Sequence, residues 1–456
     1  MATLHDSGSA ATPVPLIRPK YPGELVLRLV RNPLEHFTRL AREHGDVVHV
    51  RMGREHIYLV SHPDLVREVL VGNQRNFKKG RALERARLLL GDGLLTSEGE
   101  HHLRHRRMIQ PEFHRQHVAQ YADTMVEVAA RRTATWRDGA PVDMHKEMSA
   151  VALSIASQTL FGADVGHESE EIGAALEATF GTFMRTFYMP FGDLVLRLPI
   201  PSSRRFWQGA HRVQDTVNRL IAERRASGED RPDLLSLLLR ARDVEGDGGG
   251  MTDDEVRDEV LTFFLAGHET TANALTWSWV LLAAHPEVAD RMAAEARAGG
   301  DGPLTAEHLP RLPYTRMVLS ESMRLYPPAW TVARRALGDF TLGTHRIPAN
   351  ALVVTSQWVI QRDPRWWPDP DRFDPERWRP ELAVDRPKFA YFPFGGGARM
   401  CIGEHFAWME GILVLATIAR QWHFDVRPGT TVTPHATITL RPRGGAPMTV
   451  HRRTNT

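Results

Sequence analysis

The chain's one cysteine, Cys401, lies in a glycine-rich loop that leads into an apolar helix pattern. Three glycines at 395–397 precede it, and glycine lets a loop wrap closely round a sulfur and a flat ligand without Cβ clashes. Apolar residues at helical spacing follow from Phe406 to Ile418, which sets the sulfur at the positive end of a helix dipole and favours the thiolate. A thiolate there suits a nucleophile, a redox sensor or a metal ligand. Taken alone, however, such a loop more often holds a buried, inert cysteine.

A second group of polar residues interrupts a long helical pattern. Thr252 and Glu255 form a capping box, and apolar helical spacing continues to about Leu282. About 30 residues at 1.5 Å each give about 45 Å, so this helix must cross the core. Its middle reads Ala-Gly-His-Glu-Thr-Thr at 266–271. The threonine hydroxyls fit bonds back to i−4 carbonyls. A buried carboxylate beside a hydroxyl is nevertheless costly without a task or partners, which favours a function.

Two charged stretches have an ordinary interpretation as well as a functional one. Residues 100–108 hold three histidines and three arginines, and such a run is most often a solvated helix face. Glu321 and Arg324 lie three apart on a helix, where a surface pair contributes about 0.3 kcal/mol.

The motifs resemble, in order and in spacing, those of the cytochrome P-450 superfamily, and the chain is similar to its soluble bacterial members. The haem-loop pattern of the superfamily is filled by Phe394, Gly397, Arg399, Cys401, Gly403 and Ala407. The resemblance implies that the Cys401 thiolate is the proximal ligand of haem b, where it pushes electron density onto the iron to favour O–O cleavage. Phe394 would shield the sulfur, and Arg399 would reach a haem propionate.

The middle of the long helix resembles the oxygen-binding groove of the superfamily. The resemblance implies that Glu269 and Thr270 form an acid–alcohol pair that relays protons during dioxygen activation. Ala266 and Gly267 would leave room for the dioxygen. These four residues are therefore the expected catalytic set.

Three further basic residues match positions that bind haem propionates in the superfamily. Within the basic run, His102 falls where many members have tryptophan or histidine, and Arg106 follows four residues later. Arg334, ten residues beyond Arg324, matches a second propionate arginine, with Arg335 as the alternative assignment. Arginine suits this role because its guanidinium binds a carboxylate through two parallel hydrogen bonds.

A structural network is implied by Glu321 and Arg324, which are followed by Leu-Tyr-Pro-Pro at 325–328. In the superfamily this glutamate and arginine form a buried network with an arginine from a later irregular segment. Arg377, within Asp-Pro-Glu-Arg-Trp at 374–378, supplies that arginine. The network would fix the scaffold under the cysteine loop.

The elements that position these residues are mainly helices. Patterns at 98–300 are mostly helical, whereas those at 331–360 and 430–450 are short and strand-like. We therefore expect a mainly α fold with small β-sheets. The resemblance implies the cytochrome P-450 fold, with haem between the long central helix and the cysteine-loop helix.

The organisation of the chain follows from its breaks and caps. Residues 1–20 are expected to be a flexible segment, and 21–456 a single haem-thiolate monooxygenase domain. A helix is expected from 33 to about 42, followed by a hairpin at 47–60. The acidic, glycine-rich stretch 243–250 predicts a linker.

Composition narrows the class of protein. The chain has 456 residues, of which 42% are apolar and 25% charged, and a formal net charge of +2, which argues against bulk nucleic-acid binding. A single cysteine excludes an intramolecular disulfide, so a reducing cytoplasm is the expected location. There is no run of about 18 apolar residues, so no membrane anchor is expected.

The source of electrons is expected to be another protein, because no flavin or iron–sulfur module follows the haem loop. A ferredoxin or flavodoxin with its reductase would supply them, with NAD(P)H used only indirectly. Arg104, Arg107 and Arg115 are expected to project towards solvent and to form a positive docking patch for such an acidic carrier. Steering of this kind is screened by salt, with a Debye length of about 8 Å at physiological ionic strength.

The resemblance implies a haem-thiolate monooxygenase that activates dioxygen and hydroxylates or epoxidises an apolar small molecule. A terpenoid-sized hydrocarbon is slightly favoured over a fatty acid, since no basic anchor for a carboxylate stands out. The expected pocket residues are Phe183, Phe187, Trp330, Val332 and Ile438, although the two phenylalanines fit a core equally well.

Three other functions stay open. A peroxygenase of the same fold, or a non-catalytic haem sensor or carrier, would not need the pair of Glu269 and Thr270. A cysteine hydrolase would use Cys401 as its nucleophile, with a partnering histidine and no iron.

Overall fold

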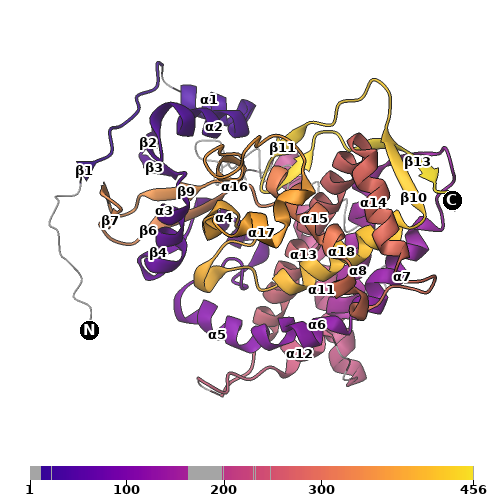
Figure 1. Cartoon of the computed structure of the whole chain (residues 1–456). Coiled ribbons are helices and arrows are strands. Elements are labelled where there is room, and N and C mark those ends of the chain that lie inside the picture. The colour runs from indigo at the N-terminus through magenta and orange to yellow at the C-terminus, as the bar shows by residue number, and fades with distance from the viewer. Residues whose placement is uncertain are drawn as a thin grey trace, which may run out of the picture. The chain divides into compact units, whose positions relative to one another are not determined.

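The computed structural model describes residues 12–454 except for 22, 163–197, 199, 230, 232 and 247. The described residues fall into two compact units. Unit 1 consists of the chain up to residue 84 together with 330–370 and 385–400, and unit 2 of 85–329, 371–384 and 401 onward. Unit 1 carries mostly strands and short helices, and unit 2 carries the long helices (Figure 1). The single domain expected from residue 21 onward stays a prediction.

The main sheet of unit 1 has the strand order β2-β3-β9-β6-β4. Its strands are β2 (Val47–Met52), β3 (Glu55–Val60), β4 (Phe77–Lys79), β6 (Val332–Ala336) and β9 (Leu352–Thr355). β2 and β3 pair antiparallel, which confirms the predicted hairpin. Side chains alternate between the faces of a strand, so Val60 and Val353 join one apolar cluster while Leu59 and Val354 join another.

Short helices complete unit 1. α2 (Pro33–His44) begins after Asn32, whose side chain accepts the N–H of Glu35, and ends at Gly45, as predicted to within two residues. Leu40 of α2 belongs to the same cluster as Leu59. The other helices and turns are α1 (Glu24–Arg31), α3 (Pro63–Arg67), η1 (Glu68–Gly72), η2 (Gln74–Asn76), α16 (Gln357–Ile360), η6 (Lys388–Ala390) and η7 (Gly397–Arg399).

Part of the N-terminal segment that the sequence predicts to be flexible is held by backbone pairing. β1 (Thr12–Pro13) runs parallel to β8 (His345–Ile347), which pairs with β7 (Phe340–Leu342). The N–H of Ile17 donates to the carbonyl of His49 at 2.9 Å. Residues 12–17 thus pair with partners more than 30 residues away, and the flexibility of residues 1–20 stays a prediction.

Unit 2 is organised round α13 (Asp253–Ala284), which is 32 residues long. The Thr252 hydroxyl accepts the N–H of Glu255 while the Glu255 carboxylate accepts the N–H of Thr252, which confirms the predicted capping box. Most of this helix is buried, because α8 (Met144–Phe161), α15 (Pro313–Leu325) and α18 (Glu404–Ala419) pack around it (Figure 1). The prediction of a helix that crosses the core is confirmed.

Further helices and small sheets surround this centre. The chain enters unit 2 within α4 (Arg81–Leu90). The helices and turns that follow are α5 (Gly99–Ile109), η3 (Gln110–Phe113), α6 (Arg115–Ala119), α7 (Ala122–Thr133), α11 (Pro201–Ser227), α12 (Leu234–Arg240), α14 (Pro286–Arg297), η4 (Ala306–Arg311), η5 (Pro375–Trp378) and α17 (Pro380–Ala383). One sheet is ordered β10 (Trp422–Val426), β13 (Pro447–Arg452), β5 (Pro141–Asp143), and β11 (Pro434–Ala436) pairs with β12 (Leu440–Pro442). The predicted class, mainly α with small β-sheets, is confirmed.

The acidic stretch predicted to be a linker is instead a closed turn. Arg242 and Gly250 form a β-bridge, and the N–H of Asp243 donates to the carbonyl of Gly249 at 3.0 Å. The Asp243 side chain is buried and accepts two hydrogen bonds from Arg107 of α5. The low-complexity composition of 243–250 suggested a linker, and composition alone does not reveal that Arg107, a residue distant in sequence, binds Asp243. Among the described residues, no helix is long and apolar enough to span a lipid bilayer.

Candidate active site

Cys401 stands just before α18 with an exposed side chain. The backbone N–H of Gly403 donates to its sulfur, and Arg106 of α5 lies close enough to act on its charge. Although part of the residue is accessible, the surrounding protein atoms raise the pKa of the thiol to about 11, while Gly403 and Arg106 lower it in part. Burial therefore opposes the thiolate that the helix terminus is expected to favour. The sulfur becomes a thiolate when a metal cation is bound to it.

α5 carries two of the basic residues that the sequence singles out. His102 is buried, and Arg106 lies one helical turn further on, which sets both on one face of the helix. Burial lowers the pKa of Arg106, and the nearby Cys401 acts in the opposite direction. The Nε of Arg106 donates to Gln110 Oε1 at 3.2 Å. α5 thus brings Arg106 to the cysteine, as expected of a residue that binds the same cofactor.

The middle of α13 is accessible although the turns on either side are not. Residues 266–270 are half-exposed, whereas residues 259–265 and 271–279 are buried. The Thr270 hydroxyl donates to the carbonyl of Ala266, four residues earlier, at 2.7 Å. This is the backbone hydrogen bond that the sequence analysis gave as the alternative to a catalytic role. Residues 266–270 therefore form a half-exposed stretch between two buried parts of α13.

Glu269 is held by a loop that is distant in sequence. Its Oε1 accepts the Thr439 hydroxyl at 2.6 Å, and Asn273 Nδ2 donates to the same hydroxyl oxygen at 3.2 Å. The Thr437 hydroxyl in turn donates to the Thr439 carbonyl at 2.9 Å. The sequence analysis missed Thr439 and Asn273, although Asn273 follows Glu269 by one helical turn and Thr439 is next to Ile438, an expected pocket residue.

Two more groups of unit 2 had no predicted role: His268, whose ring nitrogens are enclosed although the residue belongs to the half-exposed stretch 266–270, and Glu410, which is fully buried. Burial lowers the pKa of His268 to about 4, with a further effect of His145, so the ring is neutral at pH 7. Burial raises the pKa of Glu410 on α18 well above its ordinary value, and the neighbouring Thr271 hydroxyl offsets this rise in part. Neither oxygen of Glu410 makes a hydrogen bond of regular geometry within the described part of the chain. Burial of Glu410 therefore favours the protonated form of its carboxyl.

The predicted network around Glu321 is present in unit 2. Arg324 donates to Glu321 through Nε and Nη2, both at 2.8 Å, and both side chains are fully buried. Arg377 Nε lies 3.3 Å from Glu321 Oε1, as expected from its motif. The Trp378 indole N–H and the Asp374 backbone N–H also donate to the carboxylate, each at 3.0 Å. The glutamate thus holds η5 against α15.

The glycine loop ahead of the cysteine lies in unit 1. Gly397 has φ +71°, and a Cβ on it would lie 2.0 Å from the carbonyl oxygen of Leu70, so only glycine fits. Arg399 Nη1 donates to the Phe77 carbonyl at 3.1 Å, and Phe394 is half-buried. Ala398 is also fixed, since its N–H donates to Gln74 Oε1 at 2.7 Å.

The two candidate arginines of β6 differ clearly. Arg335 forms ion pairs with Glu55 and Glu84, which commit its guanidinium to those carboxylates. Arg334 is buried on the opposite face of the strand, where its Nη1 donates to the Ala333 carbonyl at 3.1 Å. The guanidinium of Arg335 is therefore already paired, and the assignment of Arg334 to a haem propionate stays a prediction.

The predicted docking arginines are mostly engaged within the protein. Arg104 pairs with Glu255 at 3.1 Å and also donates to the Gly250 carbonyl, and Arg107 binds Asp243 through two hydrogen bonds. The expectation that these two project freely towards solvent is wrong, because carboxylates more than 130 residues away pair with them. Arg115 is exposed, as expected.

The predicted pocket residues lie in different settings. Phe183 and Phe187 fall outside the described residues. Trp330 is buried in unit 1 against Phe37, with ring centroids 5.7 Å apart, and its place in a substrate pocket stays a prediction. Val332 is half-buried in unit 1, and Ile438 is 36% exposed in unit 2, beside Thr439.

Comparison with known proteins decides the family. The family model described as Cytochrome P450 matches residues 21–445. The chain belongs to the cytochrome P450 family. A similar solved structure is that of the cytochrome P450DA heme domain, with TM-score 0.88 and 28% identity, which covers 98% of this chain and 99% of that one.

Three similar curated relatives of this cytochrome P450 come from Streptomyces species. It is 40% identical to a cyclooctatin synthase of Streptomyces melanosporofaciens, over 91% of this chain and 90% of the relative. It is 41% identical to a cyclooctat-9-en-7-ol 5-monooxygenase of the same organism, over 93% and 91%. It is 37% identical to a pentalenene oxygenase of Streptomyces avermitilis, over 91% of each. The protein is a cytochrome P450 monooxygenase.

Family membership implies a haem cofactor, and the residues of this cytochrome P450 fit one. Cys401 is an exposed residue whose thiol a metal cation would deprotonate, and Arg106 places a cation beside it. Residues 266–270 of α13 are half-exposed between buried turns. Membership also implies dioxygen and a redox partner as co-reactants.

Proposed function

We propose that this monooxygenase hydroxylates or epoxidises a terpenoid-sized apolar molecule, with electrons from a separate carrier protein. The observation that carries the proposal is the half-exposed stretch 266–270 between buried turns of α13, with Glu269 anchored within it by Thr439. The names of the relatives support the substrate class, since they refer to a cyclic alkenol and to an alkene. A terpenoid hydrocarbon has no carboxylate, so the proposed substrate, unlike a fatty acid, needs no basic residue to bind one.

Cys401 is proposed as the axial ligand of haem b. When bound, the haem supplies an iron centre that activates dioxygen for insertion into a C–H or C=C bond. His102, Arg106, Arg334 and Arg399 would hold the propionates, because guanidinium groups bind carboxylates in a bidentate manner. Phe394, Gly397, Gly403 and Ala407 would shape the loop and helix start around the sulfur, where the Gly403 N–H tunes its charge.

Glu269 and Thr270 are proposed to deliver protons to the reacting oxygen. Thr439 and Asn273 orient the Glu269 carboxylate, and the Thr270 hydroxyl is fixed by the Ala266 carbonyl. A positioned acid transfers a proton faster than bulk water because it need not diffuse to the site. Ala266 and Gly267 carry the smallest side chains in this stretch and leave space for dioxygen.

The electron source is proposed to be a ferredoxin or flavodoxin with its reductase, so that NAD(P)H acts only indirectly. A cytoplasmic location would give the enzyme access to such carriers. The Glu269–Thr270 pair favours this monooxygenase over a peroxygenase or a haem sensor, neither of which needs a proton relay to activate dioxygen.

Ligand titrations followed in the Soret band test the substrate class. We expect cyclic terpene hydrocarbons and their mono-alcohols to shift the spin state at low concentrations, and long-chain fatty acids to shift it weakly. Turnover with a surrogate ferredoxin, its reductase and NADPH should then yield products one oxygen atom heavier. If fatty acids bind and turn over while cyclic terpenes do not, the proposed substrate class is wrong.

A further inference from the structure

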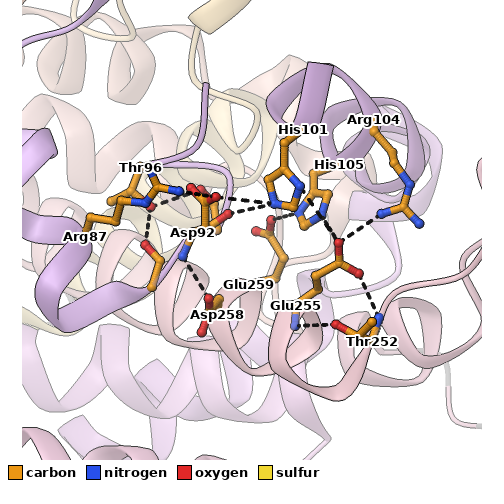
Figure 2. Close-up of polar contacts among 12 residues, drawn as sticks. Arg87, Asp92, Thr96, His101, Arg104, His105, Thr252, Glu255, Asp258 and Glu259 are labelled. Atoms are coloured by element: carbon orange, nitrogen blue, oxygen red, sulfur yellow. Dashed lines mark hydrogen bonds and ion pairs between the residues drawn. The ribbon is translucent and has the colours of Figure 1, made fainter. Parts of the chain in front are cut away.

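A cluster of histidines and carboxylates lies where α5 meets α13, away from the residues assigned to catalysis. His101 and His105 stand one turn apart on α5, and Glu255 faces them from the first turn of α13 (Figure 2). One ligand atom from each of the three residues lies within 4.8 Å of the others. Two imidazoles and a carboxylate at this spacing are a common ligand set for zinc.

The outer nitrogen of each ring is already committed to an acceptor. His105 Nδ1 lies 2.6 Å from Glu259 Oε1, and His101 Nε2 lies 3.2 Å from the backbone carbonyl of Asp92. A carboxylate and a carbonyl only accept hydrogen bonds, so these two nitrogens must carry the protons. The loop that supplies Asp92 is fixed, because its N–H donates to Asp258 Oδ2 at 2.8 Å.

The inner nitrogens then point at the same oxygen. His105 Nε2 lies 3.3 Å and His101 Nδ1 lies 3.9 Å from Glu255 Oε1. In neutral imidazoles both would present lone pairs to a carboxylate oxygen, which repel one another unless a cation stands among them. Figure 2 shows the rings and the carboxylate converging in this way.

We propose that His101, His105 and Glu255 bind one Zn²⁺ ion, with water as the fourth ligand. Zinc fits better than Mg²⁺ or Ca²⁺ because imidazole nitrogen suits borderline-soft metals, whereas those two ions take oxygen ligands. Glu259 supports the site as the carboxylate of a carboxylate–histidine–zinc triad, a partner that fixes the ring and raises its basicity. His105 and Glu259 are both fully buried, so the triad is shielded from water.

Charge around the site both supports and limits metal binding. Glu255, Glu259 and Asp92 contribute negative charge, while Arg104 lies 3.1 Å from Glu255 Oε1 and Arg87 pairs with Asp92. The competing occupant is a proton: burial lowers the pKa of His105, and the two carboxylates raise it by more than that. A doubly protonated His105 would bridge Glu255 and Glu259 and would leave no lone pair for a metal.

The ion would join two helices rather than take part in the oxidation. Glu259 precedes Glu269 by ten residues on α13, which corresponds to about 15 Å. α5 also carries His102 and Arg106, so a metal that fixes α5 to α13 would hold those residues in place. We therefore expect zinc to raise the thermal stability of the holoenzyme and to slow haem loss.

Zinc binding is tested on the holoenzyme after chelation and dialysis against Zn(II). We expect one zinc per chain by elemental analysis, and a zinc K-edge absorption spectrum that shows two imidazole ligands. His101→Ala and Glu255→Gln should each weaken binding at least tenfold, and glutamine keeps the capping box because it too can accept the Thr252 N–H. Glu259→Gln should weaken binding by about 10–100-fold, the range for such supporting partners.

The matched control is His117→Ala, an exposed histidine of α6, which should bind zinc like the parent. The carbon monoxide spectrum of each variant shows that the fold and haem site are intact. Zinc below one-tenth of an equivalent in the parent would overturn the proposal, as would full zinc binding by His101→Ala. A His105 ring that stays doubly protonated with excess zinc, by nitrogen NMR at neutral pH, would assign the cluster to the proton instead.

Discussion

At the scale of single residues, the acid on α13 is a group that its neighbours hold in place. The hydrogen bond from Thr439 to Glu269 is short, and Asn273 donates to the same hydroxyl oxygen, so the hydroxyl proton must go to the carboxylate. A carboxylate held in this way can accept and release protons without first changing its side-chain orientation. The turn that carries Thr439 also presents Ile438, so the acid and the proposed substrate wall share one support.

Removing that hydroxyl should impair oxygen chemistry more than folding. Thr439→Val keeps the shape of the side chain, and we expect turnover to fall about tenfold or more as proton delivery is disturbed.

Thr270→Ala should instead divert reducing equivalents to hydrogen peroxide, because the hydroxyl at the oxygen site is lost. Peroxide formed per NADPH consumed measures this. Thr216→Val, an exposed threonine of α11, is the control, and fully coupled turnover in Thr270→Ala would count against the relay.

The buried carboxyl group of Glu410 leads to a prediction about how the stability of the protein depends on pH. Its pKa is raised well above the ordinary value in the folded protein, so the native state binds a proton that the unfolded chain releases near pH 4.5. Stability therefore falls as pH rises above the unfolded pKa, and is unaffected below it. Glu410→Gln should raise stability at pH 7–8 and have little effect near pH 4, by urea unfolding. Glu127→Gln, an exposed control, should show neither effect, and an unchanged Glu410→Gln would refute the assignment.

At the scale of elements, α15 and η5 are joined by ionic contacts that are fully buried. Glu321 accepts from Arg324, Trp378 and the Asp374 backbone, so removal of its charge leaves two arginines without compensation. Because Glu321→Gln removes the buried negative charge that faces Arg324 and Arg377, we expect it to destabilise the protein by about 3 kcal/mol, although Arg324 also donates to the Arg372 carbonyl. Arg346→Gln, which breaks an exposed pair with Asp339, should have little effect. Equal losses in both variants, measured by urea unfolding, would contradict the account.

The elements also show how far the sequence could be interpreted. Local signals sufficed for α2, for the β2–β3 hairpin and for the capping box of α13, because caps and periodicity act within a few residues. The pairs of Arg107 with Asp243 and of Arg104 with Glu255 join residues more than 130 positions apart. No local pattern marks such partners. For that reason the docking patch and the linker were predicted wrongly, and Thr439 was missed.

At the scale of the whole molecule, the chain carries a monooxygenase site and draws electrons, in our proposal, from a separate protein. We expect NADPH alone to give no product, and a ferredoxin with its reductase to restore turnover. Hydrogen peroxide in place of both should support only a small fraction of that rate. The reverse order of activities, with peroxide as the better co-substrate, would make the enzyme a peroxygenase despite its Glu269–Thr270 pair.

Charge reversal at Arg107 tests whether this arginine serves the stability of unit 2 rather than the docking of an electron carrier. Because both arginines pair with carboxylates inside unit 2, Arg107→Glu should destabilise the protein by placing like charges together at Asp243. Arg115→Glu, at an exposed position, should leave stability unchanged. Thermal unfolding of both variants checks this, and equal stability of the two would show that the Arg107 pair contributes nothing.

The central claim is that Cys401 is the axial ligand of a haem, and carbon monoxide tests it most directly. We expect the reduced protein under carbon monoxide to show the red-shifted Soret band of thiolate ligation. Cys401→His should abolish that band while haem stays bound, and Met400→Leu, at the neighbouring position, should keep it. Persistence of the same band in Cys401→His would contradict the assignment, since the chain has no other cysteine.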